Sequence, residues 1–422
     1  MIAKIRDFLK THLDKTQILL FLSIIGPGII TANVDNDVGG IATYSLAGAN
    51  FGYTILWSLI PITILLILVQ EICARMGVMT GKGLADLIRE NFGLRTTFYL
   101  MIVLVIVNLA NTISEFAGVA AAGEIFGISR YILVPLVAIG IWWIVVKGSY
   151  KSVEKIFLFA CLFYFAYIIS GFMAKPDWGV AIKNTLIPSF HFSTPYLMMI
   201  VALVGTTIAP WMQFYLQSSV VEKGIKRAHY KYSKIDVITG CIITDVVAFF
   251  IIVATAATIF KVGGNITNAA DAALALKPLA GRWASYLFAF GLLNAGIFAA
   301  SILPISTAYT VCEGIGFESG VNKKFSQAKQ FYILYTAMIV IGAAVILIPN
   351  IPLIPVMYLS QVLNGILIPF ILIYMLKLVN KKELMGKHVN KGFFNILTWA
   401  GAILVIALTV MMIGIPIIQK IF

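Results

Sequence analysis

The chain has 422 residues, of which 60% are hydrophobic and only 12% are charged, and its mean hydropathy is +0.96. A soluble domain of this length does not tolerate such a composition, so the soluble classes of protein are excluded and a membrane protein is predicted. The net charge of +13 does not indicate a nucleic-acid partner, because most of it falls on segments expected at the cytoplasmic face of a membrane.

Segments of about 20 apolar residues cross a bilayer as helices. The sequence contains eleven such segments, which predicts an all-α polytopic membrane protein with a single transmembrane domain over residues 17–422. Residues 1–16 are mixed in charge and lack a small-residue cleavage site, so we expect a cytoplasmic tail there and not a signal peptide. The expected spans are 17–48, 53–77, 97–123, 129–148, 153–174, 195–221, 235–260, 283–311, 330–349, 352–376 and 393–418.

The basic residues predict the orientation of these spans. With the N-terminus in the cytoplasm, all but seven of the 31 Lys and Arg residues lie on the cytoplasmic side, as the positive-inside rule requires. We therefore expect a cytoplasmic N-terminus, an extracellular C-terminus, and a location in the cell membrane with the lipid bilayer as partner. The seven residues left outside are Arg130, Lys175, Lys183, Lys261, Lys277, Arg282 and Lys420.

Polar residues interrupt the first span. Between Gly26 and Gly40 the chain carries Gly, Pro, two Asn residues and two carboxylates, Asp35 and Asp37. A charge at bilayer depth costs a few kcal/mol or more, so such groups usually face a cavity on a substrate or ion path. The flanking Gly and Pro indicate a broken helix whose freed carbonyl oxygens act as ligands. We expect a cation site at the membrane midplane; the alternative is a surface loop between two short helices.

The sixth span is interrupted in the same way, at Gly205 and Pro210. The first and sixth spans are corresponding members of two five-span halves, and paired broken helices indicate an inverted-repeat transporter with its site at the repeat interface. Half-helix ends with free carbonyls favour a cation there. A packing kink at Pro210 would explain the sixth span alone. The expected divisions are repeat one at about 17–174, repeat two at about 195–376 and an eleventh helix at about 393–418.

Several motifs resemble those of one family, the Nramp divalent-metal transporters. The run from Gly26-Pro27-Gly28 to Phe51-Gly52-Tyr53 is similar to their first span, and the run over residues 70–85 is similar to the end of their second. Shorter similarities cover nearly the whole chain. The resemblance implies a LeuT-type fold, with ten core spans in two inverted repeats plus an eleventh, and we expect a monomer. The shorter similarities are Ser218-Ser219, Gly291 to Gly296 and Leu359 to Leu363.

Departures from the family pattern indicate the substrate. The family reads Asp-Pro-Gly-Asn where this chain has Asp37-Val38-Gly39-Gly40, and Met-Pro-His where it has Ala209-Pro210-Trp211. The carboxylate is kept, but the amide and the soft thioether that favours manganese and iron are lost, unless Met212 approaches the site instead. A roomier oxygen-only site suits a partly hydrated Mg²⁺ ion, and these replacements resemble those of the Nramp-related magnesium transporters.

The resemblance and the polar residues of the spans together define an expected metal site. Thr206 and Ala209 offer carbonyl oxygens at the second break. Asp35 either holds waters around the ion or caps a helix. Gln361 and Asn364 share one helical face, where they either reach the hydration shell of the ion or bond across helices. The expected metal-binding residues are Asp37, Gly40, Thr206, Ala209, Asp35, Asn36, Gln361 and Asn364.

The proton-coupling residues of the family are largely replaced. Where the family places an Asp and a Glu in the third span and a His in the sixth, this chain has Thr112, Glu115 and Trp211. A single carboxylate is a poor relay, because proton transfer needs successive groups within hydrogen-bond reach. We therefore expect uncoupled, electrogenic import of Mg²⁺ and also Mn²⁺. The metal ion would be the substrate, and no cofactor is expected. A proton-coupled Mn²⁺ and Fe²⁺ symporter is the alternative.

Other function classes are less well supported. A sodium-coupled amino-acid transporter shares the fold, but the two acidic residues at the first break would repel an amino-acid carboxylate. An ion channel does not need broken-helix repeats. An enzyme is not expected, since the sequence has no His-Glu-x-x-His, no Gly-x-Ser-x-Gly and no histidine in a span. We further expect an ion pair between Glu71 and Arg75 at the inner gate, and structural roles for Asp236 and Asp245.

Overall fold

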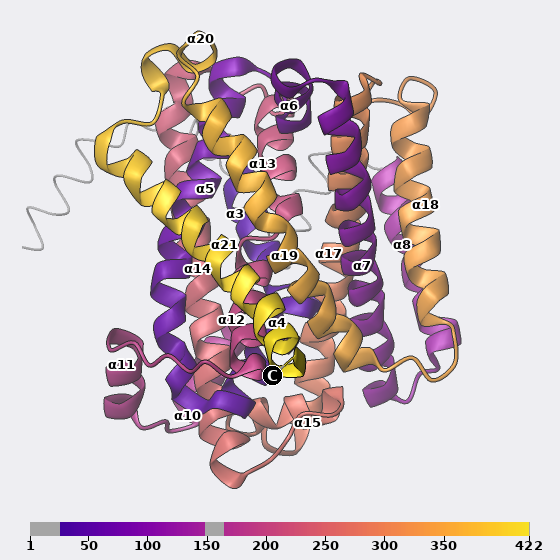
Figure 1. The fold of residues 1–422 in the computed structure, drawn as a ribbon. Helices are drawn as coiled ribbons and strands as arrows, with labels where there is room; N and C mark the ends of the chain where they lie inside the picture. Colours follow the sequence, from indigo (N-terminus) through magenta and orange to yellow (C-terminus); the bar gives the residue numbers. More distant parts are fainter. Residues whose placement is uncertain (1–25, 148–163, 422) are drawn as a thin grey trace, which may run out of the picture.

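The structure is a computed structural model that describes residues 26–147 and 164–421, and every regular element in these ranges is a helix (Figure 1). The long helices are α5 (Leu59–Thr80), α7 (Leu94–Phe126), α8 (Arg130–Lys147), α14 (Tyr230–Thr258), α17 (Ala284–Ile315), α18 (Lys329–Ile346), α19 (Leu353–Val379) and α21 (Gly392–Ile421). The shorter ones are α3 (Pro27–Asn33), α4 (Val38–Phe51), α6 (Leu84–Phe92), α10 (Phe165–Met173), α11 (Trp178–Leu186), α12 (Thr194–Thr207), α13 (Pro210–Glu222), α15 (Ala269–Ala272), α16 (Lys277–Ala280) and α20 (Lys382–Met385). The 3-10 segments are η1 (Val34–Asn36), η2 (Gly52–Ser58), η4 (Arg227–His229), η5 (Phe260–Val262), η6 (Ala273–Leu276), η7 (Gly281–Trp283) and η8 (Gly386–His388).

Nine helical stretches among the described residues are long and apolar enough to cross a membrane. The predicted all-α polytopic architecture is therefore confirmed. The second to fourth and sixth to eleventh expected spans each coincide with a helix or a broken pair of helices. Of the first and fifth spans, residues 17–25 and 153–163 lie outside the described part of the chain. The second half of the first span and the whole second span together form one of the nine stretches, which covers residues 38–80.

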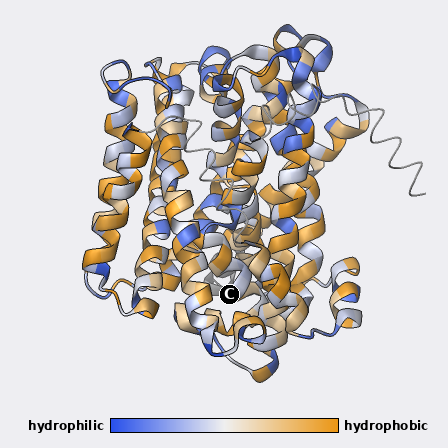
Figure 2. Cartoon of the chain, turned by 180° about the vertical axis from the view of Figure 1, so that it is seen from behind, coloured by the Kyte–Doolittle hydropathy of each residue, from blue (hydrophilic) through white to orange (hydrophobic). Residues whose placement is uncertain are grey.

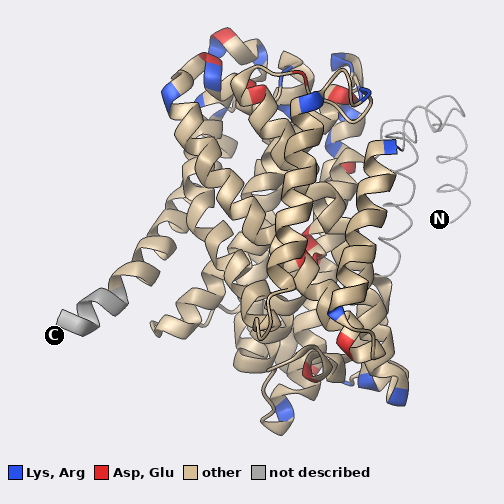
Figure 3. Ribbon diagram, turned by 90° about the vertical axis from the view of Figure 1, so that its right-hand side faces the viewer, with Lys and Arg blue, Asp and Glu red and all other residues tan. Residues whose placement is uncertain are grey.

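The helices stand side by side, with α6 and α20 at one end of the bundle and α11 and α15 at the other (Figure 1). Hydrophobic residues cover the shafts of the helices, whereas hydrophilic residues gather at the two ends and in a patch at mid-height (Figure 2). Lys and Arg residues concentrate at the end that carries α6 and α20 (Figure 3). We call this the basic end; Lys82, Lys226, Lys382 and Lys387 are among its residues.

The centre of the bundle is formed by α4, α12 and α13, which are buried almost along their whole length. Glycines allow the close approach of their neighbours. A Cβ atom on Gly205 of α12 would overlap the backbone of Gln361 and Gly365 in α19, and one on Gly28 of α3 would lie 2.6 Å from the backbone nitrogen of Val237 in α14. The outer helices expose apolar side chains such as Ile139, as expected of a surface in lipid.

Candidate metal site

Both expected breaks are present near the middle of the bundle. In the first, α3 passes through η1 into α4, and Asp37 caps α4 with its carboxylate, which accepts a hydrogen bond from the Gly40 N–H (2.6 Å). In the second, α12 ends at Thr207 and α13 begins at Pro210. Because proline has no N–H, the Thr206 carbonyl oxygen lacks the donor that a continuous helix would supply.

Oxygen atoms from the two breaks converge around Gly40. A Cβ atom on Gly40 would lie 3.1 Å from Thr206 Oγ1 and 3.3 Å from Asp37 Oδ1, and it would overlap the carbonyl oxygen of Asp35. The Thr206 hydroxyl is buried and has no hydrogen-bond partner among the described residues. We call these four residues, Asp35, Asp37, Gly40 and Thr206, the junction. It combines a carboxylate, a hydroxyl and main-chain carbonyls, which are the ligand types that hard divalent cations prefer.

Ala209 is the N-terminal cap residue of α13, three positions after Thr206. Its carbonyl oxygen accepts a hydrogen bond from the Met212 N–H (3.1 Å) and is thus engaged in the first turn of that helix. Trp211 and Met212 are both buried. The Trp211 carbonyl accepts a hydrogen bond from Ser306 Oγ of α17 (3.0 Å), which fixes the start of α13 against α17.

Gln361 and Asn364 of α19 have different environments. The Gln361 side chain lies against Gly39, so close that a Cβ atom there would overlap it. Its Oε1 atom accepts a hydrogen bond from Asn364 Nδ2 (2.8 Å). Asn364 in turn forms a reciprocal amide pair with Asn111 of α7, with bonds of 2.8 and 3.1 Å. Gln361 therefore borders the junction, whereas Asn364 bonds across helices, which was one of its two expected roles.

Asn36 is turned toward α14. Its Nδ2 atom donates to Thr244 Oγ1 (2.7 Å) and to the Thr244 carbonyl (3.3 Å). The Thr244 hydroxyl also donates to the carbonyl of Ala32 at the end of α3. These contacts fasten η1 to α14. The Asn36 amide nitrogen thus serves helix packing. Its side-chain oxygen is buried and has no hydrogen-bond partner among the described residues, so its role as a metal ligand stays a prediction.

Asp35 and Asp245 form a pair of buried carboxylates beside that contact. Neither has a hydrogen-bond partner among the described residues, and their charges lie close enough to repel each other. Asp37, and not Asp35, caps α4, so the capping role considered for Asp35 is wrong. The Thr63 hydroxyl of α5 lies near the Asp245 carboxylate, and the structural role expected of Asp245 stays a prediction.

Asp236, by contrast, has the structural role expected of it. Its carboxylate accepts hydrogen bonds from the backbone N–H groups of Gly26 (3.2 Å), Gly28 (2.6 Å) and Ile29 (3.3 Å). These are the first amides of α3, which have no partner within the helix itself. Asp236 thus holds the beginning of α3 against α14.

Of the three residues at the family's proton-path positions, Glu115 of α7 contacts the junction. Its Oε2 atom accepts a hydrogen bond from the Val38 N–H (3.2 Å), whereas its Oε1 atom is buried and has no hydrogen-bond partner among the described residues. The carboxyl group of Asp37 lies near that of Glu115. The Thr112 hydroxyl donates to the Asn108 carbonyl of its own helix (2.9 Å), and its methyl group faces Gly342 of α18. The Thr112 side chain therefore forms a hydrogen bond within α7 and packs against α18.

Among the described residues, no three His, Cys, Asp or Glu side chains gather in a metal-binding arrangement. A metal ion at the junction would rely on Asp37, with Glu115 beside it, and on oxygen atoms of the two broken helices. Asn111 and Tyr44 are neighbours that the sequence did not single out, and Asp245 was expected only in a structural role. Tyr44 reaches the second break through a hydrogen bond between its hydroxyl and Thr207 Oγ1 (2.8 Å).

Known proteins are similar to this chain over most of its length. The divalent metal cation transporter MntH of Bacillus subtilis (strain 168) is 28% identical over 407 residues, which cover 93% of this chain and 92% of the relative. The protein of the same name from Deinococcus radiodurans is 25% identical over 402 residues, covering 92% and 88%.

Solved structures share the fold. The crystal structure of the Eremococcus coleocola manganese transporter, in complex with an aromatic bis-isothiourea substituted compound, has a TM-score of 0.75 at 20% identity and covers 95% of this chain and 87% of that one. Mhp1, a nucleobase-cation-symport-1 family transporter in a closed conformation, has a TM-score of 0.60 at 14% identity, with 94% and 93% covered. The predicted LeuT-type fold is confirmed. Residues 28–414 match the family model described as natural resistance-associated macrophage protein-like, and the chain belongs to this family, Nramp.

Proposed function

We propose that this chain imports divalent metal ions across the cell membrane by alternating access, with partly hydrated Mg²⁺ as its main substrate and Mn²⁺ as a second one, and without moving protons. The observation that carries the proposal is the junction, where the Asp37 carboxylate, the Thr206 hydroxyl and the Asp35 carbonyl converge around Gly40. Relatives named as divalent metal cation transporters support the substrate class.

The preference for Mg²⁺ rests on which ligands are missing. The residue at the family's methionine position is Ala209, so no thioether at that place selects manganese over magnesium. Gly40 replaces an asparagine, which leaves the first break without a side-chain amide. Mg²⁺ holds its waters tightly and binds few protein oxygens directly. Gln361 lies against Gly39, and we propose that it bonds to such waters.

The direction of transport follows from the orientation. We assign the basic end to the cytoplasm by the positive-inside rule, which places the N-terminus inside and the C-terminus outside. An inside-negative potential then drives the ion inward, because each elementary charge gains about 2.3 kcal/mol per 100 mV and a divalent ion gains about twice that. No coupled ion is required.

A proton-coupled Mn²⁺ and Fe²⁺ symporter is the second candidate, and one contact favours it. The Glu115 carboxyl lies near that of Asp37. Two neighbouring buried carboxyl groups can share a proton, which an incoming metal ion would displace. The absence of a histidine partner at Trp211 argues against onward transfer of that proton.

Purified protein in liposomes separates the two candidates. Magnesium and manganese uptake would be measured together with a luminal pH dye, under an inside-negative potential. We expect saturable uptake of both ions with no change in luminal pH. Uptake that does not saturate would indicate a channel, and exclusion of Mg²⁺ with transport of Mn²⁺ would refute the substrate assignment.

A further inference from the structure

A cavity lined in part by charged side chains lies at the basic end and shares no lining residue with the junction. It has a volume of about 420 Å³ and lies between α5, α14 and the chain that leads into α21. Lys234, Lys387 and Lys391 line it, and none of the three forms an ion pair with a described residue. Glu71 is its one carboxylate among the described lining residues.

The floor of this cavity is a built network of donors. Arg75 forms the expected ion pair with Glu71 (3.2 Å), donates to the His388 carbonyl (3.1 Å) and bonds to the Asn390 side-chain oxygen. Asn390 is 9% exposed, and its Nδ2 atom has no hydrogen-bond acceptor among the described residues; the same holds for Arg75 Nε. Buried donors without acceptors are costly, so the floor is short of acceptor oxygens.

The charged groups around the cavity also favour an anionic ligand. Glu71 already neutralises Arg75, and the Tyr230 hydroxyl also bonds to Glu71. The pKa of the His388 imidazole is lowered from its usual range by burial and by the positive charges of Lys387, Arg75, Arg227 and Lys391. The three lysines therefore carry positive charge that no ion pair with a residue of the described ranges compensates.

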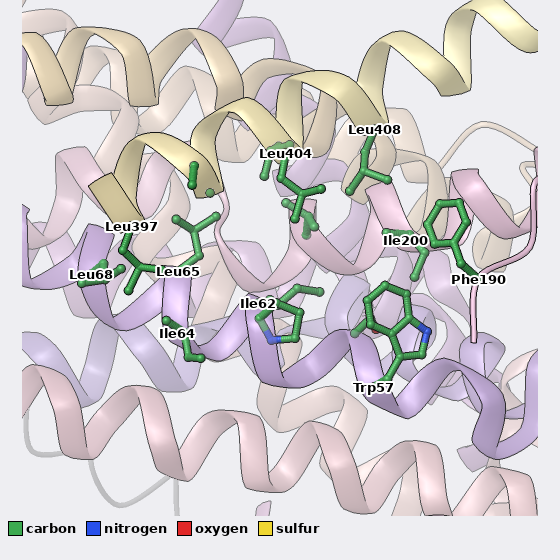
Figure 4. Close-up of a pocket in the computed structure, with 16 residues that line it drawn as sticks. Trp57, Ile62, Ile64, Leu65, Leu68, Phe190, Ile200, Leu397, Leu404 and Leu408 are labelled. Carbon is green, nitrogen blue, oxygen red and sulfur yellow. The ribbon is translucent and has the colours of Figure 1, made fainter. Parts of the chain in front are cut away.

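An apolar groove continues from this cavity along α5 and α21. Leu68 lines both, and the groove runs between α5 and α21 past Leu65, Ala400 and Leu404, with a volume of about 390 Å³. Figure 4 shows Leu68 and Leu397 at one end and Trp57 and Phe190 at the other. The groove is almost wholly apolar, as an acyl chain would require.

We propose that the cavity and the groove together bind one anionic phospholipid of the cytoplasmic leaflet, with its phosphate between the three lysines and the Arg75–Asn390 floor and an acyl chain along Leu68 and Ala400. A phosphodiester supplies the acceptor oxygens that the floor lacks and the negative charge that the lysines lack. Basic pockets between membrane helices on the cytoplasmic side are suited to such head groups. The bound lipid would link α21 to α5 and α14.

Native mass spectrometry of the whole protein in detergent, with equal amounts of phosphatidylglycerol and phosphatidylcholine, tests the proposal. We expect the wild type to retain one phosphatidylglycerol in preference to phosphatidylcholine. A Lys234→Ala/Lys387→Ala/Lys391→Ala variant should lose that preference by at least about tenfold. A variant with the same loss of charge at exposed basic-end lysines that do not line the cavity should keep it; that control is Lys226→Ala/Lys324→Ala/Lys329→Ala.

A second pair of variants tests the groove and the source of the phosphate. Ala400→Trp fills the groove and should weaken retention of the lipid, whereas Ile403→Trp, on the exposed face of α21 outside the groove, should not. Inorganic phosphate at millimolar concentration should not displace the lipid. Equal retention of both lipids, or an unchanged preference in the folded triple-lysine variant, would overturn the proposal. Displacement by phosphate with no effect of Ala400→Trp would show a site for a free anion instead.

Discussion

Asp37 caps a helix and, in our proposal, also binds the metal ion. Its carboxylate accepts the Gly40 N–H at the start of α4 and faces the oxygen atoms that converge there. The two roles respond differently to substitution, because an asparagine keeps an acceptor for the cap but loses the charge. A lost cap costs about 1 kcal/mol of stability, whereas in the proposed site the charge would offset the partial dehydration of the ion.

We therefore expect both Asp37→Asn and Asp37→Ala to abolish metal uptake into liposomes. Asp37→Asn should keep the melting temperature of the wild type, and Asp37→Ala should lower it by a few degrees. Thermal unfolding followed by circular dichroism provides the second measurement. Uptake at the wild-type rate by either folded variant would remove Asp37 from the site.

In our proposal, the selectivity between Mg²⁺ and Mn²⁺ also depends on single residues. In the wild type, Mg²⁺ and Mn²⁺ should compete for one site with affinities within about tenfold, or about 1.4 kcal/mol. Restoring a soft ligand by Ala209→Met should favour Mn²⁺ by about tenfold, because sulfur prefers the softer ion. Competition of the two ions for uptake measures the ratio, and Ala209→Leu provides a control of similar size without sulfur.

The asparagine that the family carries at the position of Gly40 cannot be restored in the same way. Gly40→Asn would place a Cβ atom on the carbonyl oxygen of Asp35, so that the backbone of the first break would have to move. A shift toward Mn²⁺ in Ala209→Leu as large as that in Ala209→Met would show that size and not sulfur controls the selectivity.

At the scale of the helices, the sequence predicts breaks well and helix register poorly. Pro210 and the cap residue Asp37 interrupt apolar runs. Both act through their own side chains, so both can be recognised from the sequence alone. The contact of Asn36 with Thr244, the Asn111–Asn364 pair and the proximity of Asp35 to Asp245 depend on which faces of distant helices meet. Uniformly apolar spans carry no periodic signal that would identify those faces.

The attachment of α3 to α14 is open to a direct test. Asp236→Ala removes the acceptor of three backbone amides, and hydrogen bonds to a charged group contribute about 1.5–3 kcal/mol each. We expect hydrogen exchange of the amides of residues 26–30 to accelerate by at least about tenfold, with an intermediate effect in Asp236→Asn, which keeps an acceptor. Mass spectrometry of peptides from the folded protein measures this. Unchanged exchange in Asp236→Ala would show that other contacts hold α3.

For the molecule as a whole, the proposed absence of proton coupling is the property to test first. Metal entry under an inside-negative potential should proceed without acidification of the liposome lumen. It should also vary little with outside pH between about 6 and 8, where neither an ordinary carboxylate nor a lysine titrates. A luminal pH dye and a series of outside buffers measure both.

The control for this expectation is Glu115→Gln, which keeps an acceptor for the Val38 N–H but removes the second carboxyl group beside Asp37. Acidification that requires metal in the wild type and disappears in Glu115→Gln would restore the proton symporter as the better description.

The two ends of α3 are both attached to the same neighbour. Asp236 holds the first amides of α3, and Thr244 holds the Ala32 carbonyl and Asn36 just beyond its last turn. Because α3 has only seven residues and is bonded to α14 at both ends, it cannot tilt independently of α14. We therefore expect α3 and α14 to move as one rigid body when the transporter changes conformation. A covalent cross-link between α3 and α14 should then leave the transport cycle running, whereas a cross-link between α3 and α13 should stop it.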